Sequence, residues 1–369
     1  MMRNKDISIY IHIPFCEHKC NYCAFNSFCA SDEIKEKYIN LLCDEIRRRK
    51  CDRVVRTIYI GGGTPSVLNE EQIKKIVGTV FENFDVYEDA EFTIEANPNS
   101  ITEQLLQTWK KLRINRLSIG VQSLNDKTLK KIGRLHNKKM ALEKIKLARK
   151  YFDNVSADLI VGLENESGKD LCGYAKQLLA LGIKHISCYL VEVYENTKIF
   201  QMIKERKYKP LGDDQTIQAF TKLSNYLCDN GMERYEISNF AFSGYESHHN
   251  LNYWARREYL GFGLSAHSFV GGKRFKNAES LKDYELGKIE EEILTNQEQI
   301  EEIIMLGLRC NLGVDLLEVK KLGYDLTKNS YFAEYIDKGI LTQKGEKVFL
   351  NQIFYHISNT IIANLFQWK

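Results

Sequence analysis

The sequence predicts an α/β fold: an open, partial (β/α)6 barrel of the TIM type, followed by a small helical, winged-helix-like C-terminal domain. Two observations support this fold class. Short apolar or β-branched segments alternate six times with helical patterns, as in parallel α/β proteins. Glycine-containing or polar motifs follow several of the predicted strands, where such folds place their working sites. Six units rather than eight favour a barrel that stays open.

The predicted elements come in regular order along the first half of the chain. Strands are expected at residues 7–13, 57–60, 91–95, 116–120, 155–161 and 185–190. Helices are expected at residues 32–50, 70–84, 102–112, 138–151 and 168–181. Their predicted N-caps are Ser31 or Asp32, Asn69, Thr102 and Ser167, which are residue types that accept a hydrogen bond from a free helix amide.

The pattern changes after about residue 205. A helix is expected at 213–229, a glycine- and aromatic-rich stretch at 235–272, and helical structure from 296 onward. We therefore divide the chain into a core at 1–235, pocket-closing loops at 236–285 and a C-terminal domain at 286–369. Near the end, apolar residues recur at helical spacing, and we expect this stripe to pack on the chain's own core rather than on a partner helix. The stripe consists of Ile353, Phe354, Ile357, Ile361 and Leu365.

Composition excludes several classes of function. The 369 residues are 44% hydrophobic and 27% charged, with a net charge of +3, which gives no reason to expect nucleic-acid binding. No signal peptide is recognisable and no apolar run reaches 18 residues, so we expect a cytoplasmic protein without a membrane span. Of the ten cysteines, seven are scattered singly and are expected to be free thiols.

The other three cysteines form a pattern directly after the first predicted strand. Cys16, Cys20 and Cys23 make a C-x3-C-x2-C triplet on one short loop. Three thiolates can hold three irons of a [4Fe–4S] cluster and leave the fourth iron open to an outside ligand. The alternatives are a zinc site and buried structural cysteines. Zinc normally needs four ligands, often as two CxxC-type pairs, and the chain has no second pair.

Further motifs close the next strands. A glycine triplet at 61–63 is followed by Thr64, and glycine lets the backbone approach a ligand closely. Glu95, Gln122, Arg134 and Asp158 each lie at or just beyond a strand end. A carboxylate near a buried strand end needs a partner, because an unpaired buried charge is costly. Internal salt bridges or a polar ligand would both supply that partner.

Together these motifs resemble those of the HemN/HemW group of radical SAM proteins, over almost the whole chain. The resemblance rests on the segment 10–25, GGGTPS at 61–66, EANP at 95–98, IGVQS at 119–123, GRLH at 133–136 and DLI at 158–160. The group contains oxygen-independent coproporphyrinogen III dehydrogenases and heme chaperones. In radical SAM proteins the open iron of the [4Fe–4S] cluster binds the amino and carboxylate groups of S-adenosylmethionine (SAM).

The resemblance implies a role for each motif residue. The three cysteines ligate the cluster. Gly62, Gly63 and Thr64 meet the amino end of the SAM methionyl group, and Arg134 pairs with its carboxylate, to which a guanidinium offers two donors. The SAM amino or ribose hydroxyl groups contact Glu95, Gln122 and Asp158. The cluster and adenosine pocket is lined by Tyr10 and Tyr22.

Two features point to the heme-chaperone branch of the group. The dehydrogenases carry a further cysteine two residues after the triplet and a longer N-terminal extension. This chain has Phe25 at that position and only nine residues before Tyr10. The second feature is the segment His249-Asn250-Leu-Asn-Tyr253-Trp254, which resembles the H-N-x-x-Y-W motif linked to heme in the chaperones.

This motif suits heme chemically. A neutral histidine is a common axial ligand of heme iron, and Tyr253 and Trp254 offer flat faces to a porphyrin. The alternative is a structural histidine in an aromatic-rich loop. His248 and His267 are two other candidates for the iron ligand.

We therefore expect a heme chaperone that holds a [4Fe–4S] cluster with SAM, binds heme and hands it to an acceptor protein, and that dimerises in some states. The rival hypothesis is an oxygen-independent coproporphyrinogen III dehydrogenase, which cleaves SAM reductively and decarboxylates propionate side chains. The chain departs from the usual group pattern at 164–167, where Pro and Gln are replaced by Glu-Asn-Glu-Ser, and at 350–354. These departures leave open how a partner protein docks.

Overall fold

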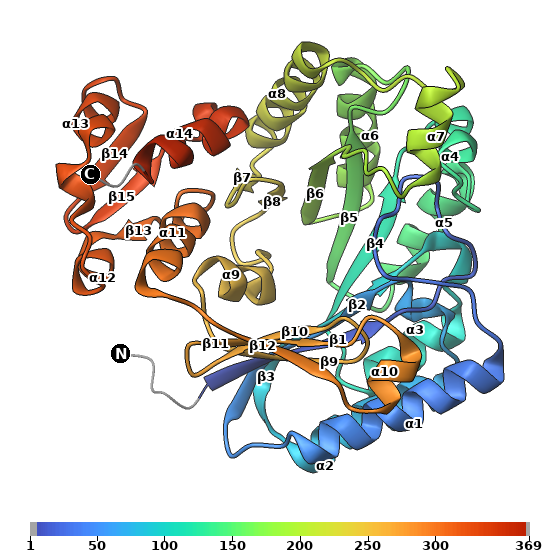
Figure 1. Cartoon of the computed structure of the whole chain (residues 1–369). Helices are drawn as coiled ribbons and strands as arrows, with labels where there is room; N and C mark the ends of the chain where they lie inside the picture. Colours follow the sequence, from blue (N-terminus) through green and yellow to red (C-terminus); the bar gives the residue numbers. More distant parts are fainter. Residues whose placement is uncertain (1–5, 367–369) are drawn as a thin grey trace.

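The computed structural model describes residues 6–366 and contains a large barrel unit and a small C-terminal unit (Figure 1). Six parallel strands form the centre of the barrel. They are β1 (Asp6–Ile13), β2 (Val54–Gly62), β3 (Asp85–Ala96), β4 (Arg116–Gln122), β5 (Asn154–Val161) and β6 (His185–Leu190). The six predicted strands are therefore confirmed, although β2 and β3 begin earlier than expected.

Helices connect these strands across the outer face of the barrel. They are α1 (Asp32–Arg48), α2 (Glu70–Asn83), α3 (Glu103–Lys111), α4 (Asp126–Lys131), α5 (Lys138–Ala148), α6 (Gly168–Ala180), α7 (Lys198–Lys204) and α8 (Asp213–Asp229). The 3-10 turns η1 (Pro65–Val67) and η2 (Pro98–Ser100) follow β2 and β3. The expected N-caps Ser31, Asn69, Thr102 and Ser167 each accept a hydrogen bond from a helix amide. The helices α4 and α7 were not predicted.

The sheet is open, as expected, but it is longer than the six predicted strands. The strand order is β12-β11-β10-β9-β1-β2-β3-β4-β5-β6-β8-β7. Strand β9 (Tyr259–Phe262) runs parallel to β1, whereas β10 (His267–Val270), β11 (Lys273–Asn277) and β12 (Ile289–Ile293) are antiparallel. At the other edge lie β8 (Asn239–Ala241) and β7 (Glu233–Arg234). Much of the segment expected to form pocket-closing loops is therefore part of the barrel sheet.

The two faces of each central strand differ in polarity. In β1, Ile9, Ile11 and Ile13 are fully buried in the core that includes residues of the surrounding helices. The alternating residues Ser8, Tyr10 and His12 are polar, because successive side chains point to opposite faces of a strand. The interior of the barrel is thus lined with hydroxyl, imidazole and charged groups.

The C-terminal unit has its own hydrophobic core. It contains α11 (Asn296–Gly307), α12 (Leu316–Lys321), α13 (Ser330–Asp337) and α14 (Ser358–Leu365), with η3 (Leu326–Lys328) and η4 (Gln352–Ile357). Strands β13 (Val314–Asp315), β15 (Lys347–Leu350) and β14 (Leu341–Lys344) form a small antiparallel sheet in that order. This arrangement confirms a small winged-helix-like domain. Two short helices, α9 (His248–Trp254) and α10 (Leu281–Glu285), belong to the segment before it.

The predicted apolar stripe is split by a change of helix type. Phe354, Ile361 and Leu365 pack on the C-terminal core as expected, but Ile353 and Ile357 are exposed. The reason is that residues 352–357 form a 3-10 helix with about three residues per turn. Side chains spaced for an α-helix therefore do not all lie on one face in this segment. Within residues 6–366, no helix combines the length and the hydropathy needed to cross a membrane.

Candidate functional site

One cavity of about 1090 Å³ is lined by residues at the carboxyl ends of the central strands and by residues of the C-terminal unit. Its volume is slightly above the range of about 300 to about 1,000 Å³ that is usual for a single small-molecule site. Residues from the loops after β1, β2, β3 and β4 line its inner half. Residues from α8, the end of α9 and the C-terminal unit line its outer half.

The three motif cysteines lie together on the loop after β1 and line the inner half of the cavity as free thiols. The Thr64 hydroxyl donates to Cys16 Sγ at 3.5 Å, and an Arg134 N–H group donates to Cys20 Sγ at 3.6 Å. Burial raises the pKa of the Cys23 thiol. The two hydrogen bonds hold Cys16 Sγ and Cys20 Sγ at the cavity wall, where cysteine thiolates can ligate iron.

A single metal ion fits this loop less well than a cluster does. No group of three His, Cys, Asp or Glu side chains within residues 6–366 is drawn together tightly enough to hold one ion. A four-iron cluster keeps its thiolate ligands further apart than one ion does. The donor set of three thiols facing a cavity therefore fits a [4Fe–4S] cluster and does not fit a closed zinc site.

The glycine loop after β2 packs closely against the cysteine loop. A Cβ atom on Gly63 would lie 2.7 Å from the Phe15 carbonyl oxygen and 3.1 Å from Cys16 Sγ. Gly62 has a φ of 114°, which side chains rarely allow. The Gly62 amide donates to Glu95 and the Gly63 amide to the Ile13 carbonyl. With these amides already used, the loop offers acceptors to a ligand, which suits an ammonium group.

Two half-buried carboxyl groups face the cavity from β3 and β5, the strands on either side of β4. Glu95 accepts hydrogen bonds from the Tyr59 hydroxyl at 2.7 Å and the Gly62 amide at 3.2 Å. Asp158 accepts from the Ser187 hydroxyl at 2.8 Å and the Ser118 hydroxyl at 3.1 Å. Burial raises the pKa of Glu95 to about 7 and also raises the pKa of Asp158. Within residues 6–366 neither carboxyl group forms a salt bridge, so both can accept a cationic or hydroxyl-bearing ligand.

Arg134 is the cation of the inner half. Its Nη2 donates to Asn97 Oδ1 at 2.6 Å and to the Gly120 carbonyl at 2.5 Å, while its buried Nε has no partner. No carboxylate pairs with it in the part of the chain that the structure describes. A guanidinium held by two neutral oxygens and the Cys20 thiol can still pair with a carboxylate. Gln122, with a φ of 66°, lies beside it and lines the same half.

Three residues at this site were not singled out from the sequence. Asn97 connects Arg134 to Thr64, because its Nδ2 donates to the Thr64 hydroxyl at 3.0 Å. Tyr59 and Ser118 hold the two carboxyl groups. Asn97 belongs to the EANP motif, so that motif was the signal for it. Tyr59 and Ser118 could have been found from the alternation of strand residues, which turns them toward the barrel interior.

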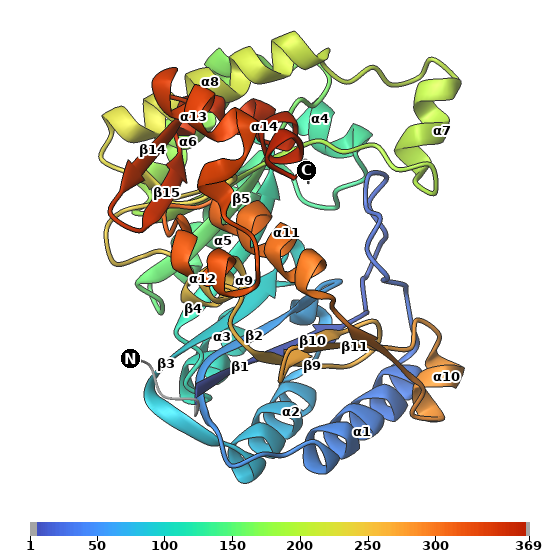
Figure 2. The same cartoon turned by 60° about the vertical axis from the view of Figure 1, so that its left-hand side comes forward.

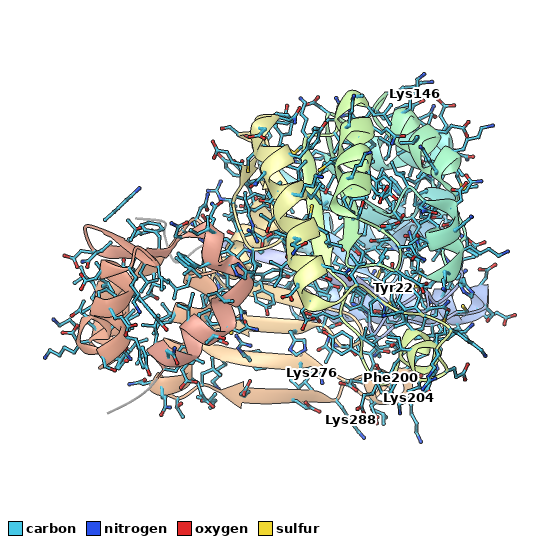
Figure 3. The ribbon with its side chains drawn as sticks, turned by 90° about the horizontal axis from the view of Figure 1, so that it is seen from above. Tyr22, Lys146, Phe200, Lys204, Lys276 and Lys288 are labelled. Carbon is cyan, nitrogen blue, oxygen red and sulfur yellow. The ribbon has the colours of Figure 1, made fainter. Side chains whose placement is uncertain are left out.

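The two predicted tyrosines are placed differently. Tyr22 lines the cavity and packs beside α7 with Ile132 and Ile199, on the barrel side of the molecule (Figure 3). Tyr10 does not line the cavity. Its hydroxyl group lies 3.0 Å from His12 Nδ1, and its ring stacks on Tyr59, which does line it. Tyr59 therefore lies between Tyr10 and the cavity. Any contact of Tyr10 with SAM stays a prediction.

The predicted heme motif lies on α9, largely inside the barrel. His249 is 1% exposed, and both of its ring nitrogens have partners: Thr57 Oγ1 at 2.8 Å and the Tyr253 hydroxyl at 2.9 Å. Burial lowers its pKa to about 3. The His249 ring would ligate iron only after losing one of these bonds. The heme role of His249, Asn250 and Tyr253 stays a prediction, and Trp254 is the one motif residue that lines the cavity.

The two other histidines weighed as iron ligands, His248 and His267, are exposed. Neither of them lines the cavity within the described residues. The backbone amides of His248 and His249 both donate to the Glu91 carboxylate at 2.9 Å, which fixes the start of α9 on β3. The motif therefore anchors α9 to the barrel.

An open parallel barrel with a three-cysteine loop at its mouth defines a radical SAM protein. Residues 10–178 match the Radical SAM superfamily and residues 294–352 match the HemN C-terminal domain. The solved coproporphyrinogen III oxidase HemN of Escherichia coli has the same fold, with a TM-score of 0.84 and 22% identity, covering 99% of this chain and 91% of that one. The cofactors of this chain are accordingly a [4Fe–4S] cluster and SAM.

Curated relatives extend over the full length. The Heme chaperone HemW of Lactococcus lactis (strain IL1403) is 31% identical over 98% of this chain and 97% of its own length. The Heme chaperone HemW of Bacillus subtilis (strain 168) is 35% identical over 93% and 94%. The chain belongs to the HemW family of radical SAM proteins.

Proposed function

We propose that this protein is a heme chaperone, which binds heme and transfers it to an acceptor protein while holding a SAM-bound [4Fe–4S] cluster. The observation that carries the proposal is the full-length similarity to two proteins named Heme chaperone HemW. The cavity supports it, because its two halves differ in chemistry.

The inner half is proposed to bind the cluster and SAM. The cysteine thiolates hold the iron, and the carbonyl groups of the loop at Gly62, Gly63 and Thr64 accept from the SAM ammonium group. The Arg134 guanidinium pairs with the SAM carboxylate. The carboxyl groups of Glu95 and Asp158, with Gln122 beside them, accept from the amino or ribose hydroxyl groups. When bound, the reduced cluster supplies the electron for reductive SAM chemistry.

The rival activity is that of a coproporphyrinogen III dehydrogenase. At the position where the dehydrogenases have a further cysteine, this chain has Phe25, whose ring is 68% exposed and lines the cavity. An apolar side chain there supplies neither a thiol nor a proton donor. We therefore propose heme handling rather than decarboxylation. We also propose a cytoplasmic location, an acceptor protein that receives the heme, and a homodimer.

Anaerobic turnover separates the two functions. Cluster-loaded protein is incubated with SAM, reductant and coproporphyrinogen III, and the porphyrins are separated by chromatography. In parallel, hemin-loaded protein is mixed with a heme-free acceptor, and the transfer is followed by absorbance. We expect no protoporphyrinogen and measurable hemin transfer. Protoporphyrinogen formed over several turnovers would contradict the chaperone function.

A further inference from the structure

The outer half of the cavity, which we call the outer chamber, is built from segments far apart in the sequence. Its walls are α8, the end of α9, the residues after α11 and the segment 352–359. In Figures 1 and 2, α14 and α8 lie near one another, on the side of the barrel that carries the C-terminal unit. The barrel and the C-terminal unit therefore both contribute to this chamber.

Apolar and aromatic side chains form much of the chamber wall. Ile217 and Phe220 project from α8, Trp254 ends α9, and Ile353 and Tyr355 come from η4. Ile353 is 67% exposed, although it lies in a domain with a well-formed core of its own. A wall of this type favours a large, flat, apolar ligand, because burial of apolar surface on both partners stabilises the complex.

Two guanidinium groups interrupt this apolar wall. Arg309 Nη2 donates to Asn359 Oδ1 at 2.6 Å, and its buried Nε has no partner. Arg234 lies over the rings of Phe220 and Tyr355, each at 4.7 Å, and its buried Nε is also without a partner. Neither arginine forms a salt bridge in residues 6–366. Burial lowers the pKa of both guanidinium groups, because loss of water disfavours their charged form.

The carboxyl group of Glu236 acts electrostatically on Arg234, but it only partly offsets the effect of burial on the pKa of this guanidinium. Glu236 is 1% exposed, and its carboxyl group accepts a hydrogen bond from the Ser238 amide at 3.2 Å. Burial raises its pKa to about 7. It makes no ion pair with Arg234 in the described chain. The two arginines therefore remain available for carboxylates that come with a ligand, and a guanidinium binds a carboxylate with two parallel hydrogen bonds.

One imidazole faces the same chamber. His356 is exposed, lines the cavity and forms no side-chain hydrogen bond with any residue between 6 and 366. It differs in this respect from the buried His249, whose ring nitrogens are both occupied. His18 also lines the cavity, but it belongs to the cysteine loop of the inner half. Cys228 lines the chamber as a free thiol and is a further candidate for the iron ligand.

We propose that the outer chamber binds heme, with His356 as the axial ligand of the iron and with Arg309 and Arg234 as the partners of the two propionates. This inference rests on the proposed function and adds the site. The lone pair of one neutral imidazole nitrogen forms the bond to ferric iron, and the water or chloride that occupied this position leaves, so no electron is transferred. An apolar macrocycle with two carboxylates and an iron atom matches a wall of apolar side chains, two guanidinium groups and one imidazole.

Hemin titrations test the iron ligand. We expect His356→Ala to shift the Soret band and to weaken hemin binding about tenfold, as for loss of one strong polar contact. Added imidazole should restore the wild-type spectrum, which a merely misfolded variant would not do. The matched variants Cys228→Ser and His249→Ala should keep the wild-type band. An unchanged band in His356→Ala, or a shifted band in Cys228→Ser or His249→Ala, would overturn the assignment.

A second titration tests the propionate partners with hemin dimethyl ester, which lacks the two carboxylates. Wild-type protein should bind hemin about tenfold more tightly than the ester, and Arg309→Gln, which keeps Arg234, should reduce that preference severalfold. Equal affinity of wild-type protein for hemin and ester would contradict the role of the arginines. Failure of wild-type protein to bind hemin at all would instead contradict the proposed heme-chaperone function, and the two results are thereby distinguished.

Discussion

The two halves of the cavity are assembled in different ways. The inner half is built from loops that directly follow successive parallel strands, so each functional group stands at a fixed position after a strand. The outer chamber combines α8 with residues 254, 309 and 352–359. Short contiguous motifs therefore encode the inner half, whereas the outer chamber depends on how the C-terminal unit packs on the barrel.

The halves also differ in how they treat charge. In the inner half, Arg134, Glu95 and Asp158 are held by amide, hydroxyl and carbonyl groups. These neutral partners hold the charged groups in place and reduce the free-energy cost of burying them. They do not neutralise the charges, so each group can still bind a ligand of opposite charge. In the outer chamber, aromatic rings, the Ile237 carbonyl and Asn359 hold the two arginines. The inner half suits a zwitterion and the outer chamber an amphipathic dicarboxylate.

The largest loss of ligand binding in the inner half should come from changes to the three motif cysteines. Changing Cys16, Cys20 or Cys23 to Ser should abolish the [4Fe–4S] cluster and SAM binding, since three ligands are the minimum for this cluster. Iron and sulfide analysis with equilibrium dialysis of SAM measures both. Cys29→Ser is the matched control on the same loop, because Cys29 is exposed and donates only to the Glu17 carbonyl. A cluster that persists without Cys20 would contradict the assignment.

The next largest effect is expected at Gly63. In Gly63→Ala the new methyl group would meet the Phe15 carbonyl at 2.7 Å and Cys16 Sγ at 3.1 Å, so the two loops must move apart. We expect cluster content after reconstitution to fall severalfold. Gly173→Ala is the control, because nothing lies within 4 Å of its Cβ position, and alanine in helix α6 should stabilise the fold by up to about 1 kcal/mol. Equal cluster content in both variants would show that the loops do not need their close contact.

A moderate effect should appear in the pH dependence of SAM affinity. The pKa of Glu95 is raised to about 7, so this carboxyl group is mostly neutral at pH 6 and mostly ionised at pH 8. If the SAM ammonium group binds the ionised form, affinity should be about tenfold lower at pH 6 than at pH 8. Glu95→Gln should remove this dependence, whereas Glu192→Gln at the exposed side of the cavity should keep it. A flat profile for the wild type would remove Glu95 from SAM binding.

The smallest effect on ligands is expected for His249. His249→Ala leaves Thr57 and Tyr253 without a partner and should lower the free energy of unfolding by about 2 kcal/mol. Because the pKa of His249 is about 3 in the fold, its contribution is present above the unfolded pKa of about 6.5 and is lost as the pH falls toward 3. Urea unfolding at pH 7 and pH 5 measures the difference. Weaker hemin binding without a change in stability would favour a direct heme role for His249.

The sequence predicted the parallel core well, because buried parallel strands and capped helices leave strong local signals at positions such as Asn69 and Ser167. The strands β9–β12 were missed because they are short and carry polar residues, for example Glu290–Glu292 in β12. Their existence depends on pairing with β1 and with one another, which no local pattern encodes.

Most of the residues predicted from the sequence for SAM and the cluster line the inner half of the cavity, whereas the placement of Tyr10 and the contribution of Asn97 were not predicted. Both depend on which neighbour a side chain meets in the barrel: His12 for Tyr10, and Arg134 and Thr64 for Asn97. The outer chamber was not predicted beyond Trp254. Arg309 and His356 belong to no short motif. They line the cavity only because of the way the C-terminal unit packs.

The most direct test of the account is whether SAM and heme occupy the cavity together. Cluster-loaded protein is dialysed against labelled SAM with and without one equivalent of hemin, and both bound ligands are counted. Separate inner and outer halves predict one SAM and one hemin per chain, with SAM affinity unchanged by hemin. Displacement of SAM by hemin in proportion to its occupancy would show that the two ligands share one site and would contradict the division of the cavity.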